Sequence, residues 1–438
     1  MEYGCIGEKL AHSFSKEIHN ALTDYQYELK ELAKDEVDVF MTEHNFKAIN
    51  VTIPYKQTVI PFLDFIADEA KEIGAVNTVV NKAGKLFGYN TDFFGMKSLI
   101  ERTGIVVENK TVAILGGGGT AKTAEAVSKS LGAKTIYKVS RSSKESFITY
   151  DELYNISDTI DVIINTTPVG MYPNIYESAV EIERFKNLSG VVDAVYNPLR
   201  SKLVSDALNR NIKAVGGLYM LVAQAAFAVE YFIDIKIEKD KIEDVFNTLF
   251  KKKENIVLIG MPSSGKSTVG NILSKKLKRE FFDSDLLVAE TENMTIPDIF
   301  ESKGEAYFRN AETEAIFTLS KNNSSVISTG GGAVLNKKNI ELLKENGKVF
   351  FLDRPLEMLI TTSDRPLSSN KSDLEKRYNE RYDLYKASAD IKIDASGTVE
   401  DVINQIMKVT EWKSLLLMDQ ILICWAYVSL RFMAKKHI

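Results

Sequence analysis

The sequence predicts an α/β fold, in which helices pack against mostly parallel sheets. Short apolar runs alternate with helical patterns along most of the chain, and this alternation is typical of strand–helix–strand units. Two of the runs end in a glycine-rich turn that leads into a helix. With 438 residues, the chain is long enough for roughly three units of about 150 residues each.

The first half of the chain supplies many of the predicted strands. Phe46 to Ile53 is an apolar run stopped by Pro54, and Val76 to Val80 is another, so we expect a parallel α/β sheet within the first hundred residues. Thr111 to Leu115 leads directly into four glycines. Further strands are expected at Thr135 to Val139, Asp161 to Asn165 and Val191 to Ala194, and helices at Thr120 to Leu131 and Gly217 to Ile235.

A charge run separates the two halves of the chain. Lys251, Lys252 and Lys253 interrupt the apolar pattern and predict a linker, although a solvated helix end fits the same residues. The strand–helix rhythm restarts after them with strands predicted at Asn255 to Ile259 and Ser325 to Ser328. Because each half carries its own glycine-rich turn, the chain resembles two fused proteins.

Composition restricts the partners of the chain. Lys+Arg is 55 and Asp+Glu is 60, so the net charge is −5 and no broad basic surface for nucleic acid is expected. The only cysteines, Cys5 and Cys424, offer neither a disulfide framework nor a clustered metal site. The start of the sequence lacks a basic segment followed by a long apolar one, so we expect a cytoplasmic protein without a signal peptide.

One apolar stretch near the end of the sequence does not fit this simple composition. Leu415 to Met433 is mostly apolar, but Asp419 and Arg431 interrupt it and its unbroken part, Ile421 to Leu430, is short. A membrane span needs about 20 apolar residues. A docked helix or a non-native tail is therefore favoured over a span, and no firm membrane partner is predicted. The oligomeric state is not predictable.

The first glycine-rich turn predicts a dinucleotide site. Gly116, Gly118 and Ala121 match the pattern G-x-G-x-x-A between a strand and a helix, where phosphates lie on the helix N-terminus. A purely structural glycine turn is the alternative. The next strand ends at Ser140 and Arg141 rather than at an acidic residue; an arginine there favours NADP over NAD, unless it is an ordinary surface residue. The remaining cofactor-binding candidates in the turn are Gly117, Gly119 and Thr120.

Several polar side chains that suit a small hydroxylated acid precede this turn in the sequence. Ser13 and Ser15 place two hydroxyls two residues apart, and Lys56 follows a predicted strand. The other short polar groups are Asn50-Val51-Thr52, Asn77-Thr78 and Asn90-Thr91-Asp92.

These motifs resemble shikimate dehydrogenase over about residues 1–250. The resemblance is carried by the segments Gly7 to Asn20, Asn50 to Lys56, Gly74 to Thr78, Asn90 to Asp92, Asn165 to Met171, Asp193 to Pro198 and Gly217 to Gln224. It implies shikimate contacts from Ser13, Ser15, Thr52, Asn77, Asp92, Tyr196 and Gln224, and adds Gly217 to the cofactor-binding residues. It also implies that Lys56 and Asp92 form the catalytic pair when NADPH reduces 3-dehydroshikimate. Lys16 departs from the family, which usually has proline there.

The second glycine-rich turn is a P-loop. Gly260 to Ser267 fits G-x-x-x-x-G-K-S after a strand, so Lys266 is expected to reach ATP phosphates and Ser267 to ligate Mg²⁺. Backbone and side chains of Ser263, Ser264, Gly265 and Thr268 are expected to hold the nucleotide. Asp283 and Asp285, expected on one side of a strand end, suit Mg²⁺ and an acceptor hydroxyl, although a solvated loop is the alternative.

The second half resembles shikimate kinase over about residues 254–412. The P-loop, Asp283-Ser284-Asp285, Gly304 to Arg309, Gly330 to Gly332, Arg365-Pro366-Leu367 and Arg381 before Tyr385 carry the resemblance. It implies that Asp285, Arg309, Gly331 and Arg381 bind shikimate, that Asp285 orients or deprotonates its hydroxyl, and that Arg365 reaches ATP. The segment before Arg365 and the segment Asp394 to Gly397 lack arginines that the family often has, which is compatible with a slow kinase.

Together the motifs predict a bifunctional shikimate-pathway enzyme. We expect a substrate domain at 1–100 completed by 217–250, a Rossmann NADP domain at 101–216, a P-loop kinase domain at 254–412, and a tail at 413–438 of unknown role. A quinate/shikimate dehydrogenase that uses NAD and carries a weak kinase is one alternative. A non-catalytic sensor of shikimate-type ligands is another, which the intact catalytic residues disfavour. Channelling between the two sites is not predictable.

Overall fold

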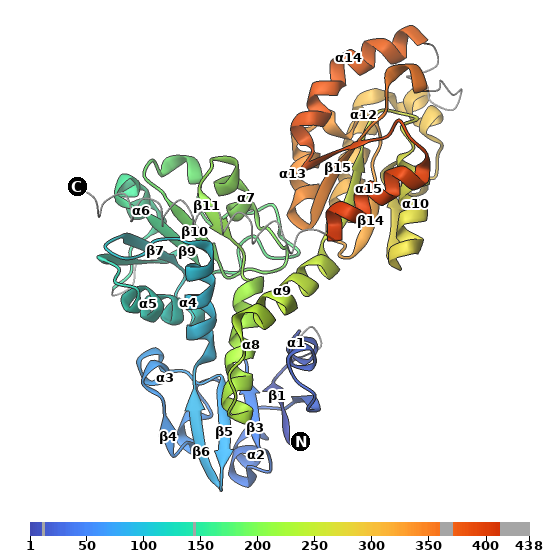
Figure 1. Cartoon of the computed structure of the whole chain (residues 1–438). Helices are drawn as coiled ribbons and strands as arrows, with labels where there is room; N and C mark the ends of the chain where they lie inside the picture. Colours follow the sequence, from blue (N-terminus) through green and yellow to red (C-terminus); the bar gives the residue numbers. More distant parts are fainter. Residues whose placement is uncertain (11–13, 143–145, 360–370, 412–438) are drawn as a thin grey trace, which may run out of the picture. The chain divides into compact units, whose positions relative to one another are not determined.

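The computed structural model describes residues 1–10, 14–142, 146–359 and 371–411 (Figure 1). Its contacts divide the chain into a first unit, Met1–Phe250, and a second unit, Lys251–Ile438, and each is considered by itself. Three predicted features lie outside the described residues: Ser13, Arg365 and the tail at 413–438. No helix in the described part of the chain combines the length and the apolar character that crossing a membrane requires.

The first sheet is mixed rather than parallel. In the described residues it has six strands in the order β2-β1-β3-β5-β6-β4, and β5 runs antiparallel to both β3 and β6. The prediction of a parallel sheet is wrong here because β5 and β6 form a hairpin. Its two turn residues, Ala83 and Gly84, have φ angles of 53° and 83°, which suit a tight hairpin turn. The strands are β1 Tyr3–Gly7, β2 Tyr27–Glu31, β3 Ala48–Val51, β4 Phe65–Ile66, β5 Thr78–Lys82 and β6 Lys85–Tyr89.

Two long helices cross closely beside the first sheet. A Cβ atom on Gly95 of α4 would lie 2.7 Å from the Met220 carbonyl oxygen and 2.9 Å from Gln224 Cβ of α8, so only glycine fits at this crossing. The crossing brings Gln224 next to the first turn of α4, although the two are far apart in the sequence. The helices of this part are α1 Ser15–Leu22, α2 Val37–Glu43, α3 Asp68–Ile73, α4 Thr91–Thr103 and α8 Leu218–Ile233, with a short 3₁₀ turn η1 at Ile60–Phe62.

The second sheet is parallel in the order β11-β10-β9-β7-β8, in agreement with the predicted α/β rhythm. The chain reverses direction across the sheet at β7, and ligands of such folds bind at the carboxyl ends of the strands near this reversal. The glycine-rich turn follows β7. The elements are β7 Thr111–Leu115, α5 Gly119–Ser130, β8 Thr135–Val139, α6 Tyr150–Asn155, η2 Ser157–Thr159, β9 Val162–Asn165, η3 Ile182–Arg184, β10 Gly190–Asp193, α7 Lys202–Asn209 and β11 Lys213–Val215.

The predicted linker is the last turn of a helix. α9 runs from Lys239 to Lys253, and the division between the units falls inside it, after Phe250. Lys253 is buried, so the alternative of a solvated helix end fits only the first part of the lysine run.

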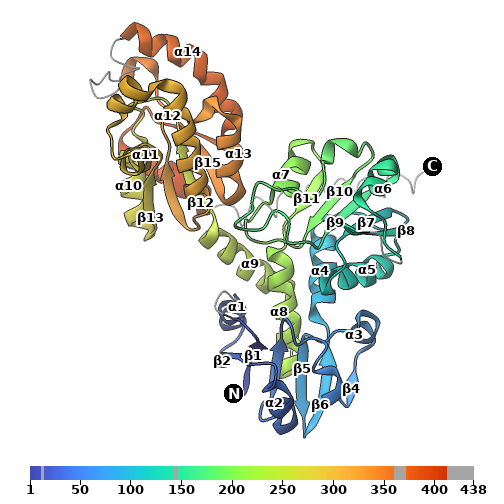
Figure 2. The same ribbon diagram turned by 180° about the vertical axis from the view of Figure 1, so that it is seen from behind.

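The second unit is built on a parallel sheet in the order β13-β14-β12-β15-β16, of which Figure 2 labels β12, β13 and β15. Every residue of the central strand β12 is buried. Gly304 interrupts α12 with φ 84° and ψ 169°. The elements are β12 Asn255–Ile259, α10 Lys266–Leu277, β13 Glu280–Asp283, α11 Ser284–Glu292, α12 Ile296–Ser320, β14 Ser325–Ser328, η4 Ala333–Leu335, α13 Lys337–Asn346, β15 Gly347–Asp353, η5 Leu356–Met358, α14 Lys371–Ser388, β16 Ile391–Asp394 and α15 Val399–Glu411.

Candidate active sites

A lysine–aspartate ion pair lies beyond the carboxyl end of β3 in the first sheet. Lys56 follows β3 in a turn that is fixed where the Val76 N–H donates to the Lys56 carbonyl oxygen at 2.8 Å. Asp92 lies in the first turn of α4, which Asn90 caps. Lys56 Nζ and Asp92 Oδ2 are 2.5 Å apart, and the two side chains are 28% and 21% exposed. The pair is therefore held together while it stays open to a ligand.

The Asn77 carboxamide is oriented by three donors. Its Oδ1 accepts from the Thr91 N–H at 2.7 Å, the Thr91 hydroxyl at 3.2 Å and the Thr78 hydroxyl at 3.1 Å. Because the carbonyl oxygen is occupied, the amide NH₂ is the group left to donate to a ligand. Thr91 Oγ1 also lies 3.4 Å from Gln224 Oε1, so its single O–H can donate to the amide oxygen of either of two predicted shikimate contacts.

A buried layer supports these amides from behind. Asn50 Nδ2 donates to Thr78 Oγ1 at 3.1 Å, and the Tyr27 hydroxyl donates to Asn50 Oδ1 at 2.7 Å. The His19 ring stacks on Tyr27 with ring centroids 3.9 Å apart. Burial lowers the pKa of His19 to about 3, so the ring stays neutral. The motifs do not reveal this supporting role, because Tyr27 and His19 approach Asn50 only in the folded sheet.

The other predicted shikimate contacts come from separate elements of the first unit. Thr52 follows β3, where its N–H donates to the Ile6 carbonyl oxygen at 3.0 Å. Ser15 is the first residue of α1 and is half-buried. Tyr196 follows β10, its ring lies edge-on to Phe14 at 6.1 Å between centroids, and burial raises the pKa of its hydroxyl.

The glycine-rich turn after β7 is open at its centre. Gly116 has φ 111°, and a Cβ there would lie 2.8 Å from Thr166 Oγ1. Gly118 and Gly119 have nothing within 4 Å of such a Cβ, so the backbone at the start of α5 is accessible to a dinucleotide phosphate. Gly117 faces the Phe147 ring, and Thr120 lies in the first turn of α5. These observations fit the predicted NADP site.

The tip of β8 lies beside this turn. The Gly116 N–H donates to the Val139 carbonyl oxygen at 2.9 Å, which brings Ser140 and Arg141 near the glycines. The Ser140 hydroxyl donates to the Ser142 carbonyl oxygen, and the Arg141 side chain is exposed. Gly217, by contrast, is packed against the protein backbone, because a Cβ there would lie 2.3 Å from the Ala194 carbonyl oxygen.

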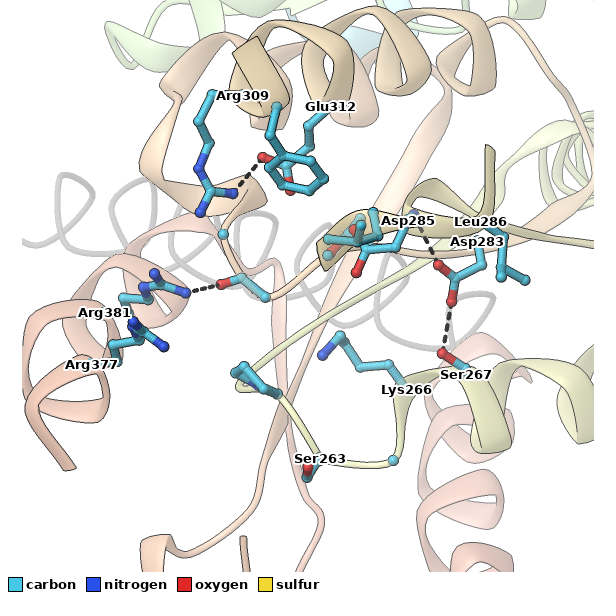
Figure 3. Close-up of a pocket in the computed structure, with 18 of the residues that line it drawn as sticks. Ser263, Lys266, Ser267, Asp283, Asp285, Leu286, Arg309, Glu312, Arg377 and Arg381 are labelled. Atoms are coloured by element: carbon cyan, nitrogen blue, oxygen red, sulfur yellow. Dashed lines mark hydrogen bonds and ion pairs between the residues drawn. The ribbon is translucent and has the colours of Figure 1, made fainter. Parts of the chain in front are cut away.

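The second unit contains a cavity of about 550 Å³ at the carboxyl ends of its strands (Figure 3). Predicted residues from five separate segments line it together. They are Ser263, Gly265, Lys266, Ser267, Thr268, Asp283, Asp285, Arg309, Gly331 and Arg381. Ser264 is buried beneath the P-loop rather than on the cavity wall.

The P-loop lysine and serine have partners within the protein. Lys266 Nζ donates to the carbonyl oxygens of Gly260 and Met261 at 2.9 Å each, which compensates the burial of its charge. The Ser267 hydroxyl donates to Asp283 Oδ2 at 2.7 Å. A hydroxyl and a carboxylate side by side at a helix N-terminus are oxygen donors of the kind that Mg²⁺ prefers, so these residues fit the predicted metal.

The two acidic residues after β13 do not share a strand end. Asp283 is the last residue of β13 and caps α11 by accepting from the Asp285 N–H at 3.0 Å, whereas Asp285 lies in the first turn of that helix. The prediction of strand alternation is therefore wrong, because the chain turns into a helix between them. Both side chains still line the cavity (Figure 3).

The three glycines after β14 make room for the site's own side chains. A Cβ on Gly330 would lie 2.3 Å from Asp285 Oδ1 and 2.7 Å from Glu312 Oε1. A Cβ on Gly332 would lie 2.0 Å from Arg309 Nη1. Glycine at these two positions therefore leaves space for the side chains of Asp285, Glu312 and Arg309.

Glu312 is a site residue that the motifs did not single out. It is buried beneath the cavity, and Arg309 Nη1 donates to its Oε2 at 2.9 Å. Burial raises the pKa of Glu312 although Arg309 opposes that shift. For Arg309, burial alone would lower the pKa, but the carboxylates of Glu312 and Glu305 outweigh it and raise the pKa. A spacing of three residues on a helix was the available signal, since it places both side chains on one face.

Comparison with known proteins identifies both halves. Residues 5–79 match the family model of the shikimate dehydrogenase substrate binding domain, and residues 262–411 match that of shikimate kinase. A curated relative, shikimate dehydrogenase (NADP(+)) of Clostridium beijerinckii, is 38% identical over 262 residues, which cover 56% of this chain and 96% of the relative. The chain belongs to the shikimate dehydrogenase family. In the same polypeptide, this dehydrogenase is followed by a shikimate kinase domain.

Other relatives agree with this family. The shikimate dehydrogenase (NADP(+)) of one Clostridium perfringens strain is 40% identical over 265 residues, covering 56% of this chain and 97% of the relative. A chorismate mutase/shikimate 5-dehydrogenase fusion protein from Clostridium acetobutylicum is 39% identical, with a TM-score of 0.53 over 56% of this chain and 96% of that chain. The predicted family and α/β fold class are confirmed, whereas the domain limits and individual site residues stay predictions.

Proposed function

We propose that this chain catalyses two consecutive reactions of the shikimate pathway. The first unit reduces 3-dehydroshikimate to shikimate with NADPH, and the second unit phosphorylates shikimate with ATP and Mg²⁺. The observation that carries the proposal is the presence of two constellations in one polypeptide: the Lys56–Asp92 pair and an open glycine turn in the first unit, and a cavity that joins the P-loop to Asp285 and two arginines in the second.

In the proposed reductase site, Lys56 acts on the reacting oxygen. NADPH, when bound, supplies the hydride. The Lys56 ammonium would lie beside that oxygen and would donate a proton to it or stabilise the negative charge that develops there. Asp92 holds that ammonium at 2.5 Å and accepts from a substrate hydroxyl. The Asn77 NH₂ donates to another hydroxyl, because its carbonyl oxygen is already occupied.

The preference for NADP rests on Arg141. Its place at the end of β8 suits a 2′-phosphate, and the curated relatives carry NADP(+) in their names. A solved shikimate dehydrogenase of Listeria monocytogenes, 26% identical with a TM-score of 0.51 over 56% of this chain and 96% of that chain, is described in complex with shikimate and NAD, so NAD is the second candidate. Steady-state kinetics with both cofactors decide between them: Arg141→Ala should raise the KM for NADP at least tenfold and leave that for NAD unchanged.

In the kinase site, the residues divide between nucleotide and acceptor. Ser267 and Asp283 would hold Mg²⁺, and Lys266 would leave its two carbonyl partners to reach the phosphates. Asp285 orients or deprotonates the acceptor hydroxyl, while Arg309, Gly331 and Arg381 bind the acid. Arg365 lies outside the described residues, and its proposed role is to reach ATP.

A coupled assay tests both activities together. Wild-type enzyme given 3-dehydroshikimate, NADPH, ATP and Mg²⁺ should form shikimate 3-phosphate. Lys56→Ala should abolish NADPH oxidation yet phosphorylate added shikimate, and Lys266→Ala should do the reverse. Lys71→Ala is the matched control, because Lys71 also pairs with an aspartate, Asp68 at 3.5 Å, but on an exposed surface. Near-normal reductase activity in Lys56→Ala would refute the catalytic assignment. Ligand binding without turnover would favour the sensor.

A further inference from the structure

A stripe of three side chains on α14 leads from the core to the cavity. Arg377, Arg381 and Tyr385 are spaced by four residues and therefore lie on one face of the helix. The buried Tyr385 hydroxyl donates to the Gly331 carbonyl oxygen at 2.5 Å, and the buried Arg381 donates to the same oxygen at 3.0 Å. These bonds fix the rotation of α14 about its axis. Arg377, one turn earlier, is partly exposed and lines the cavity.

Arg377 lies at the end of the cavity away from the metal-binding residues. Figure 3 shows it beside Arg381, whereas Ser267, the P-loop serine at the start of α10, and Asp283 lie on the opposite side. The motifs of the second half do not include it, and none of the roles proposed above requires it. Its position is next to the proposed acid-binding residues.

The described part of the cavity wall carries more cations than carboxylates. Arg309 donates to Glu312 at 2.9 Å and to Glu305 at 3.1 Å, and Arg381 donates to the Gly331 carbonyl oxygen. Among the described residues of the cavity wall, the cations Lys266, Arg309, Arg377 and Arg381 stand against the carboxylates Asp283, Asp285 and Glu312. Arg377 thus gives the wall its excess of positive charge.

We propose that Arg377 is a further substrate-binding residue of the kinase site and contacts the carboxylate of shikimate beside Arg381. The proposal rests on the kinase function proposed above. A guanidinium presents several N–H donors in one plane and matches a carboxylate better than a lysine ammonium does. A phosphoryl oxygen of ATP is a different ligand for the same cation, but its place is at the P-loop and metal end of the cavity.

The test compares Arg377→Met and Arg377→Lys with the control Lys376→Met, which removes the same charge from an exposed neighbouring position of α14. Dehydrogenase activity of each preparation, measured with NADP and shikimate, reports the amount of enzyme through the first unit, and far-UV circular dichroism of each variant checks that the second unit is folded as well. For the kinase, KM for shikimate, KM for ATP and kcat are measured separately. Arg377→Met should raise KM for shikimate about tenfold, with Arg377→Lys in between and Lys376→Met like the wild type.

The methyl ester of shikimate sharpens the assignment. The wild type should have a higher KM for the ester than for shikimate. Arg377→Met should not raise the KM for the ester further, because the ester already lacks the carboxylate that Arg377 is proposed to contact. An unchanged KM for shikimate in Arg377→Met would overturn the proposal, as would a change confined to KM for ATP or to kcat. Absence of kinase activity in the wild type would instead refute the function on which the proposal rests.

Discussion

Replacing Gly332 by alanine tests whether the glycines after β14 exist to seat Arg309. Gly332 has φ −100° and ψ −6°, so alanine adopts its backbone without strain. The new Cβ, however, would lie 2.0 Å from Arg309 Nη1, whereas ordinary contact begins at 3.4 Å, so the guanidinium must move by about 1.4 Å. A misplacement of about 1 Å can cost about 100-fold in rate. We therefore expect kcat/KM for shikimate in the kinase reaction to fall about 100-fold, or about 2.7 kcal/mol.

The measurement is ADP formation with varied shikimate at saturating ATP and Mg²⁺, normalised to dehydrogenase activity in the same sample. The double variant Gly332→Ala/Arg309→Met should be no worse than Arg309→Met alone, because alanine acts through the arginine it displaces. If Gly332→Ala keeps kcat/KM within twofold of the wild type, the steric reasoning is wrong. Equal additive losses in the double variant would show that alanine acts elsewhere.

Two further predictions concern the first unit. Thr91→Val removes the hydroxyl that can donate to Asn77 or Gln224, so KM for shikimate in the dehydrogenase reaction should rise about five- to tenfold, and Thr91→Ser should restore it; equal values for valine and serine would contradict this. Burial raises the pKa of Asp193 from 3.8 to about 6, so the folded state binds this proton more tightly than the unfolded chain, and the group's contribution to stability falls as pH rises from about 4 to 6. As pH rises between these values, the free energy of unfolding of Asp193→Asn should therefore increase by up to about 3 kcal/mol relative to that of the wild type. Denaturant unfolding measures this difference, and a difference that does not change with pH would refute the assignment.

Local patterns predicted most of the fold and the phosphate-binding turns. Thr111–Leu115, Thr135–Val139 and Asn255–Ile259 are strands with the expected limits, because apolar runs bounded by glycine or charge leave little choice of register. The P-loop and the first glycine turn are equally local, since their chemistry depends on residues that are neighbours in the chain. Lys56 and Asp92 were matched through motifs, and the folded sheet supplies the 2.5 Å contact between them.

Features that depend on contacts between residues far apart in the chain could not be predicted from the sequence. The antiparallel β5 follows from a two-residue turn at Ala83 and Gly84, where alanine in a left-handed conformation is not the usual hairpin signal. The sequence pattern predicts Asp285 at a strand end, because the start of α11 has no strong boundary signal apart from Asp283 itself. The support of Asn77 by Asn50 and Thr78 arises only when β3 and β5 pair, so spacing along the chain could not reveal it.

The helical lysine run has a practical consequence for separating the two activities. Arg279 donates to the carbonyl oxygens of Lys251 at 2.6 Å and Glu254 at 2.7 Å, and the Ser324 N–H donates to that of Lys253 at 2.9 Å. A kinase fragment that begins at β12 would therefore leave these donors without their acceptors. A stable fragment should begin at or before Lys251, whereas a dehydrogenase fragment should keep Phe250, whose ring lies under the Arg200 guanidinium at 5.5 Å. Adjacent residues of one helix thus belong to different enzymes, and a cut one turn to either side damages one of them.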